Sequence, residues 1–338
     1  MHLHFIKSDI SLGLSSGRLS VKNLKDGSLE NDFPFADVEG ISIFGNPHLS
    51  TVLLRGCMQN GIPILFYSSD GHYFGRLLST AKVDPFRQKA QLYASDNPDF
   101  RLILSKKIVS AKINNSLAFL KSRPNIYPFA DEELRGMYHS LEYIHEASTI
   151  SEAMGYEGRA AKVYFACLPK LLENEFCNFK GRSARPPKDP FNSMLSYSYS
   201  LLYRNIIGAL EGAGLNPYFA FLHDMKHGHA ALASDLIEEW RAVLVDRVVL
   251  DFANDEDLGS EDFHENSKGS VFMDRKIMKR LTTCLGDAMV RKCEYFSNEG
   301  DRKHYGFQVA LQMKINNLIK AIEKNDPSLY IPFIWNKD

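Results

Sequence analysis

One histidine and two acids near the middle of the C-terminal half have the types and spacing of a metal site. His223 follows the apolar run YFAFL, and a polar loop separates it from Asp235 and Glu238. On a helix, residues three apart are neighbours, with Cβ atoms roughly 5–6 Å apart. The loop is long enough to bring the imidazole back to the carboxylates. One nitrogen and two oxygens suit manganese or magnesium better than structural zinc.

The same residues also have a purely structural interpretation. Asp235 and Glu238 would form an acid-rich first helical turn, where the helix N-terminus favours anions. A histidine near acids is commonly a hydrogen-bonded surface group, and His227 and His229 lie in the same loop. From this segment alone, both interpretations remain open.

Glu157 is the best candidate for a third ligand. It is flanked by Gly155 and Gly158 inside a strongly helical pattern. Each interior glycine costs about 1 kcal/mol relative to alanine, which suggests close approach of a helix, a metal or a phosphate. Tight helix packing against Ala160 and Ala161 is the alternative.

Residues 177–192, CNFKGRSARPPKDPFN, form a stiff and basic segment. Three prolines stiffen it, and its charged residues are four bases and one acid: Lys180, Arg182, Arg185, Lys188 and Asp189. Such a loop is a plausible phosphate-contacting element. A solvated linker is the more common role of a basic loop, and it is the alternative here.

The surrounding elements predict an α+β chain, with a small N-terminal β-strand domain and a larger all-α helical domain that carries the metal site. Residues 1–83 contain short, partly alternating apolar segments split by turn signals, with one helix around Ser50–Gln59. Asp84–Pro85 is a typical helix start, and residues 84–338 then show apolar positions at helical spacing. We expect the acidic stretch 254–270 to be irregular and mobile.

Composition excludes few functions. The chain has 338 residues and a formal net charge of -1, so no overall basic character indicates nucleic acid, although a local basic stripe would suffice. The N-terminal segment is not a signal peptide, and no apolar run reaches the roughly 18 residues of a membrane span. The five cysteines are scattered and never spaced as CxxC, which predicts a cytoplasmic protein without a thiolate zinc site.

Four segments together resemble one family. They are EGRAAKVYF, FKGRSARPPKDPFNSMLSYSYSLLY, the L-x-P-Y-x-A-F-L-H pattern of Leu215–His223, and LASDLIEEWRAVLVDRVV. In this order and spacing they resemble the CRISPR-associated integrase, CRISPR-associated protein one, which is the catalytic subunit of the spacer-acquisition complex. The resemblance covers the whole helical domain, and the N-terminal β domain fits the family's architecture.

The resemblance implies a metal-dependent DNA endonuclease and integrase. It implies Glu157, His223 and Glu238 as ligands of Mn²⁺ or Mg²⁺, with Asp235 as a close auxiliary acid. The expected reaction is attack by the 3′-hydroxyl of a short duplex on a phosphodiester at the edge of a CRISPR repeat. The expected partners are DNA, a second copy of the chain, dimerised through the N-terminal β domain, and the small CRISPR-associated protein two; no membrane is expected.

For the DNA backbone we expect contacts from five basic residues: Arg182, Arg185, Lys188, Lys162 and Arg241. On the helix of Glu157, Lys162 ranks slightly above Arg159 for this role. Arg241 lies three residues after Glu238, where it would either pair with that acid or bind phosphate.

Two other functions compete with integration. His223–Asp224 is an HD dipeptide, as in metal phosphohydrolases that act on nucleotides, and His139 and His145 would then supply further ligands. A non-catalytic DNA-binding scaffold with a decayed site is the second alternative. Nucleotide turnover without DNA would favour the first, and the absence of any metal-dependent chemistry would favour the second.

Overall fold

The structure is a computed structural model. It describes residues 1–5, 7–68, 73–77, 84–183, 186–255, 257–291, 293–296 and 302–335. The chain divides into two compact units, Met1–Pro85 and Phe86–Asp338, which we describe separately. The N-terminal unit is built of strands and the second is mostly helical, so the predicted fold class is confirmed.

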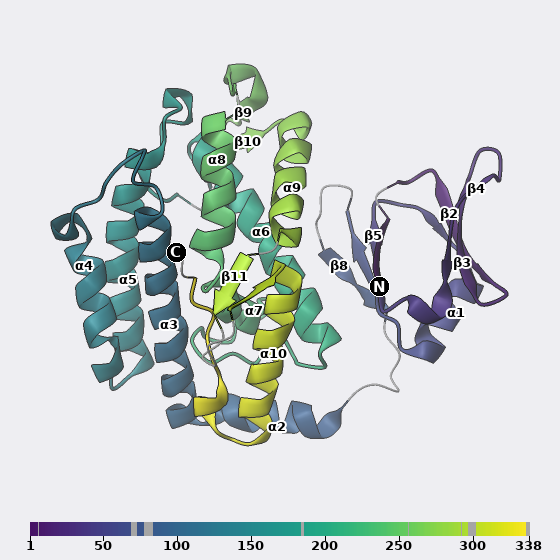
Figure 1. The fold of residues 1–338 in the computed structure, drawn as a ribbon, viewed down its shortest axis with the longest axis horizontal. Coiled ribbons are helices and arrows are strands. Elements are labelled where there is room, and N and C mark those ends of the chain that lie inside the picture. Colours follow the sequence, from purple (N-terminus) through teal and green to yellow (C-terminus); the bar gives the residue numbers. More distant parts are fainter. Residues whose placement is uncertain are drawn as a thin grey trace. The chain divides into compact units, whose positions relative to one another are not determined.

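The N-terminal unit contains two four-stranded sheets (Figure 1). The first has the order β4-β3-β2-β6, formed by Leu29–Pro34, Arg18–Asn23, Ile10–Ser15 and His48–Leu49. The second has the order β1-β5-β7-β8, formed by His2–Phe5, Gly40–Phe44, Ile64–Tyr67 and Tyr73–Leu77. In the second sheet β1, β5 and β7 run parallel, and β8 returns antiparallel.

Local sequence signals account for the turns and the helix of this unit. Ser16 and Gly17 both have positive φ, which gives the two-residue hairpin turn between β2 and β3. The predicted helix is α1, Thr51–Asn60, and the Ser50 hydroxyl caps it by accepting from the Leu53 N–H at 3.2 Å.

The second unit contains the following helices: α2 (Pro85–Asp96), α3 (Pro98–Lys121), α4 (Asp131–Tyr143), α5 (Ile150–Cys167), α6 (Pro190–Gly212), α7 (Ala231–Ile237), α8 (Arg247–Asp255), α9 (Arg275–Val290) and α10 (Phe307–Glu323). Helix α3 is central to it. It contacts α4 and α5, which lie beside it in Figure 1, and buries residues all along its length. A helix that is apolar on several faces is expected in such a position.

Two parts of this unit differ from the sequence-based expectation. The larger domain is not purely α-helical, because it carries two short hairpins, β9–β10 (Phe263–Glu265 with Val271–Met273) and β11–β12 (Cys293–Phe296 with Arg302–Tyr305). Strand β9 of the first hairpin falls in the stretch 254–270 that we expected to be irregular, and its partner β10 follows directly after that stretch. Both strands are only three residues long, too short for a clear alternating pattern.

The helical segment after the histidine loop is also broken. Helix α7 ends at Ile237, a turn follows, and residues Arg241–Asp246 form a π-helix before α8 begins. The sequence predicts one continuous helix here. π-helical turns are rare and occur frequently at functional sites. No helix in the described part of the chain is both long and apolar enough to cross a membrane.

Candidate active site

Three elements that are distant in sequence meet at one buried ammonium group. Lys112 on α3 lies 2.6 Å from Glu238 Oε2, measured from its Nζ, and it also pairs with Glu157 Oε1 on α5. Helix α5 is fixed at its start by Thr149, whose hydroxyl accepts from the Glu152 N–H. The structure therefore brings Glu157 and Glu238 to the same place, as the sequence predicted.

Glu238 is held as a carboxylate. Only 5% of the residue is exposed, and Arg241 Nη2 lies 3.1 Å from its second oxygen, Oε1. Burial would raise the pKa of Glu238, but the charges of Arg241 and Lys112 outweigh it and lower the pKa to about 2. Arg241 thus pairs with the acid, which is one of the two roles expected for it.

Asp235 organises the histidine loop. Its carboxylate accepts the backbone N–H groups of Phe221, Leu222 and His223 at 2.7, 3.0 and 2.9 Å, and it also pairs with His223 Nδ1 at 2.8 Å. It is completely buried. Since both of its oxygens are engaged, Asp235 orients His223 and leaves the second ring nitrogen available to a ligand.

His223 and Glu238 are electrostatically coupled. Burial would lower the pKa of His223, but the hydrogen bond and charge of Asp235, together with the charge of Glu238, raise it above its ordinary value. The charge of His223 in turn contributes to the lowered pKa of Glu238. The His223 imidazole therefore lies near the carboxylates of Asp235 and Glu238.

The position of the acids on their helix differs from the expectation. Helix α7 begins at Ala231, so Asp235 lies past its first turn and Glu238 is its C-cap. The structural interpretation required the helix N-terminus to stabilise both carboxylates. Neither residue lies there, so the helix N-terminus does not stabilise their charges. Instead, Asp235 is stabilised by hydrogen bonds from the loop, and Glu238 by two cations.

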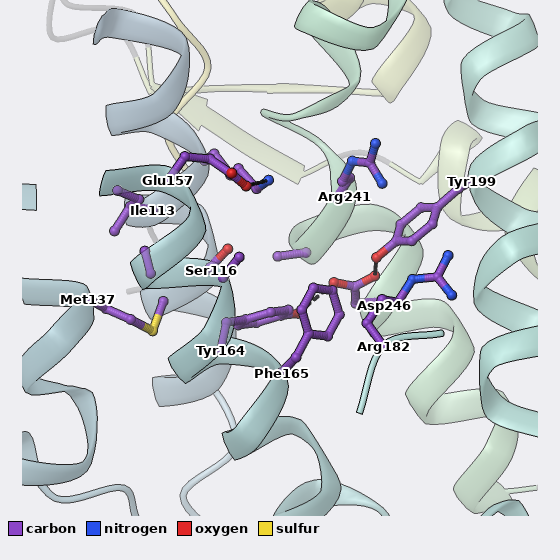
Figure 2. Close-up of a pocket in the computed structure, with 14 residues that line it drawn as sticks. Ile113, Ser116, Met137, Glu157, Tyr164, Phe165, Arg182, Tyr199, Arg241 and Asp246 are labelled. Carbon is purple, nitrogen blue, oxygen red and sulfur yellow. Dashed lines mark hydrogen bonds and ion pairs between the residues drawn. The ribbon is translucent and has the colours of Figure 1, made fainter. Parts of the chain in front are cut away.

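A cavity of about 230 Å³ is lined by Lys112, Glu157 and Arg241, and Figure 2 shows Glu157 and Arg241 beside it. At its far side Asp246 accepts hydrogen bonds from the hydroxyls of Tyr164 and Tyr199. Burial raises the pKa of Asp246 to about 6, against the effect of these hydrogen bonds. The Arg241 guanidinium stacks on the Tyr199 ring at 4.6 Å.

Sequence reasoning missed Lys112, Tyr164, Tyr199 and Asp246. A lysine on a long helix, 45 residues before its partner Glu157, carries no local signal. The Ser- and Tyr-rich stretch around Tyr199 is compatible with contact to sugar–phosphate or with a polar packing face, and the sequence does not distinguish the two. Asp246 and Arg247 interrupt the otherwise apolar run VLVDRVV, and an acid inside such a run is a usable signal.

Of the five predicted DNA-binding residues, Arg241 pairs with Glu238, and the other four differ in their surroundings. Lys162 and Lys188 are exposed. Arg182 is half-buried and bonds to the Ser183 carbonyl, Asn192 Oδ1 and Ser196 Oγ, so it ties the basic segment to α6. Arg185 lies outside the described residues.

The two glycines beside Glu157 are not explained by tight packing. A Cβ built on Gly155 or Gly158 meets no described protein atom within 4 Å. Packing against Ala160 and Ala161 therefore does not account for them, since both glycines lie on an exposed part of α5.

The residues of the HD alternative do not converge. Asp224 has 84% of its side chain exposed and faces Arg101 at 4.0 Å, whereas His223 pairs with Asp235. His139 faces Arg159 at 3.0 Å. His145, the other expected ligand, accepts a hydrogen bond from Lys106 through its carbonyl.

In the described ranges, no three His, Cys, Asp or Glu side chains stand close enough together to hold a metal ion. The donor types nevertheless fit a hard divalent cation, because two carboxylates and an imidazole border one charged centre. Glu238 Oε2 is buried and makes no hydrogen bond of good geometry, despite its ion pair with Lys112. This oxygen has a lone pair available to a cation.

Comparison with known proteins identifies the family. The family model for CRISPR associated protein Cas1 matches residues 3–286. The CRISPR-associated endonuclease Cas1 of Mycobacterium tuberculosis (strain H37Rv) is 38% identical over 326 residues, which is 96% of this chain and 95% of the relative. A Cas1 endonuclease of Thermus thermophilus is 35% identical and covers 78% of this chain and 77% of its own length.

Solved structures share the fold. A Cas1 protein from Thermotoga maritima superimposes with a TM-score of 0.71 at 22% identity, covering 100% of this chain and 99% of its own. A casposase bound to integration product gives 0.72 at 22% identity, with coverage of 96% and 91%. These findings confirm the resemblance drawn from the sequence motifs: the chain belongs to the CRISPR-associated protein Cas1 family.

Proposed function

We propose that this chain is a metal-dependent DNA endonuclease and integrase that inserts short duplex DNA into a CRISPR array. The 3′-hydroxyl of the incoming DNA attacks a phosphodiester at the edge of a repeat, and the phosphodiester's own 3′-oxygen leaves. The proposal is supported by family membership, by relatives named endonucleases, and by a casposase of the same fold bound to integration product.

One structural observation carries the proposal. Glu157 and Glu238 come from different helical segments, yet their carboxylates share one buried ammonium group beside His223. Burying ionised groups costs desolvation free energy even when they are paired, and such perturbed charged groups cluster at functional sites.

Glu157, His223 and Glu238 are the proposed ligands of Mn²⁺ or Mg²⁺. Asp235 serves as a positioning residue, since it holds His223 through its ring and its backbone. When bound, such an ion polarises a phosphoryl oxygen and lowers the pKa of an attacking hydroxyl.

The protein's own cations would neutralise the charge that develops on phosphorus. Arg241 is fixed between Glu238 and the face of Tyr199, so its guanidinium is oriented before DNA binds. Lys162 and Lys188, which are both exposed, would bind the DNA backbone.

The proposed assembly follows the family. It contains a second copy of this chain, dimerised through the N-terminal β domain, and the small CRISPR-associated protein two, which is called Cas2 in solved assemblies of similar fold. The basic segment would face DNA, with Arg182 fixing its base and Lys188 and Arg185 reaching the backbone.

The test is strand transfer of a duplex with 3′-hydroxyl ends into a repeat-bearing plasmid, with the small partner subunit present. We expect covalent joining with Mn²⁺ or Mg²⁺, and no joining when the duplex carries 3′-deoxy ends. Nucleotide hydrolysis without strand transfer would move the assignment to a phosphohydrolase. No metal-dependent chemistry at all would leave a DNA-binding scaffold.

A further inference from the structure

Among the residues of the candidate site, Lys112 is the one that the sequence gives least reason to expect. Only 19% of its side chain is exposed, and its ammonium group pairs with both Glu157 and Glu238. Burial alone would lower the pKa of Lys112, but the two carboxylates raise it above its ordinary value. Its two ion pairs place this ammonium group against both carboxylates.

The position of the Lys112 ammonium group would affect metal binding. Its nitrogen contacts one oxygen of each of the two carboxylates that we assign as metal ligands. A divalent ion bound to the same oxygens would stand within a few ångströms of the ammonium. At that distance two cations in a poorly solvated site repel strongly, so they exclude each other.

The ammonium group also has space to move into. Lys112 lines the cavity of about 230 Å³, which is also lined by Glu157, Tyr199 and Asp246. The lysine side chain is a flexible chain of four carbons, so its nitrogen can move away from the carboxylates while its backbone stays on α3.

We propose that Lys112 is a displaceable counter-ion that stabilises the paired carboxylates of Glu157 and Glu238 before metal binds and that competes with the metal for them. The inference rests on the proposed function, because it takes these carboxylates as ligands. It also accounts for the separation of the ligand side chains, because the ammonium stands between the two acids.

The experiment measures Mn²⁺ affinity, from the electron paramagnetic resonance signal of free Mn²⁺, for the wild-type chain and for Lys112→Met. Lys121→Met is the matched control, since Lys121 lies on the same helix and pairs with Asp131 at the surface at 3.2 Å. We expect Lys112→Met to bind Mn²⁺ at least tenfold more tightly than wild type, and Lys121→Met to bind it as wild type does.

The outcomes separate the two proposals. Equal or weaker Mn²⁺ binding by Lys112→Met overturns the counter-ion role, while loss of binding in His223→Ala would still support the metal site. If neither wild type nor Lys112→Met binds Mn²⁺, the proposed metal site itself fails, and the counter-ion role fails with it.

A second measurement needs no variant, in case Lys112→Met does not fold. An amine-acylating reagent is applied to the wild-type chain with and without Mn²⁺, and labelling of each lysine is read by mass spectrometry. Displacement predicts that Mn²⁺ increases labelling of Lys112 several-fold and leaves Lys121 unchanged. Unchanged or reduced labelling of Lys112 would contradict it.

Discussion

At the scale of single residues, His223 and Asp235 face each other but serve different purposes. Asp235 is fully buried and accepts three backbone N–H groups, whereas the His223 side chain is 30% exposed and has one bonded ring nitrogen. The first residue therefore holds the loop, and the second is available for chemistry.

Asp235→Ala should lower the free energy of unfolding by about 3 kcal/mol or more, because three buried N–H groups lose their acceptor. His223→Ala should change it by no more than about 1 kcal/mol, while reducing strand transfer at least 100-fold. Chemical denaturation of both variants checks this difference. Equal losses of stability would mean that Asp235 is not the anchor of the loop.

Glu239, next to the site, gives a pH-dependent prediction. Its carboxylate accepts hydrogen bonds from Tyr330 and from the Phe333 N–H, and burial raises its pKa from 4.5 to about 7. The folded chain thus holds this proton to a higher pH than the unfolded chain. The stability linked to it is complete below about pH 4.5 and is lost as the pH rises through about 7.

Glu239→Gln removes this titration. The free energy of unfolding of the variant relative to wild type should therefore rise by about 2 kcal/mol between pH 5 and pH 8. Parallel denaturation series at the two pH values measure it. A difference that is constant with pH would show that the Glu239 carboxyl titrates normally.

The sequence indicated some of these residues better than others. Their types and spacing made His223, Glu157 and Glu238 candidate ligands, and the family resemblance selected the same three residues. Lys112 was not found, because its importance arises only when α3 packs against α5. Pairing across 45 residues leaves no local pattern in a chain read without a structure.

At the scale of elements, the basic segment combines an anchored base with exposed charges. Arg182 bonds to Asn192 and Ser196 on α6, and Asp189 caps that helix through the Asn192 N–H at 2.7 Å. Lys188 on this segment and Lys162 on α5 remain exposed. Among the predicted DNA-binding residues, these two lysines are the described ones that are exposed.

The double variant Lys162→Gln, Lys188→Gln should bind duplex DNA more weakly. Two fewer phosphate contacts should reduce the slope of log affinity against log salt by about 2. Fluorescence anisotropy at several salt concentrations gives the slope. A control that replaces the exposed Lys268 and Lys279 should keep the wild-type slope. An unchanged slope in the double variant Lys162→Gln, Lys188→Gln would instead indicate that the basic segment is only a solvated linker.

Element boundaries were predictable where local chemistry decides them. Ser50 before α1 and Pro98 at the start of α3 are ordinary start signals. The π-helix at Arg241–Asp246 was not predictable, because its apolar spacing resembles that of a continuous helix. The burial of Asp246 against Tyr164 and Tyr199 depends on tertiary packing instead.

At the scale of the whole molecule, the two units differ in what they contribute to the candidate site. The helical unit holds every described residue of the candidate site, and the N-terminal unit contributes none. We therefore keep the proposal that the N-terminal β domain serves dimerisation.

Light scattering after size exclusion should give a mass about twice the 38.3 kDa of one chain. Removal of the N-terminal unit should halve the number of copies in each particle, provided the helical unit still shows its helical circular dichroism. A full-length chain that stays at 38.3 kDa at micromolar concentration would contradict the proposed homodimer.

The central claim is that His223, oriented by Asp235 and not paired with its neighbour Asp224, belongs to an integrase site. Strand transfer with Mn²⁺ and the small partner subunit tests it most directly, using wild type, His223→Ala and Asp224→Ala. We predict loss of at least 100-fold in His223→Ala and activity within about threefold of wild type in Asp224→Ala, because Asp224 is exposed and points toward Arg101. Wild-type rates in His223→Ala would contradict the account.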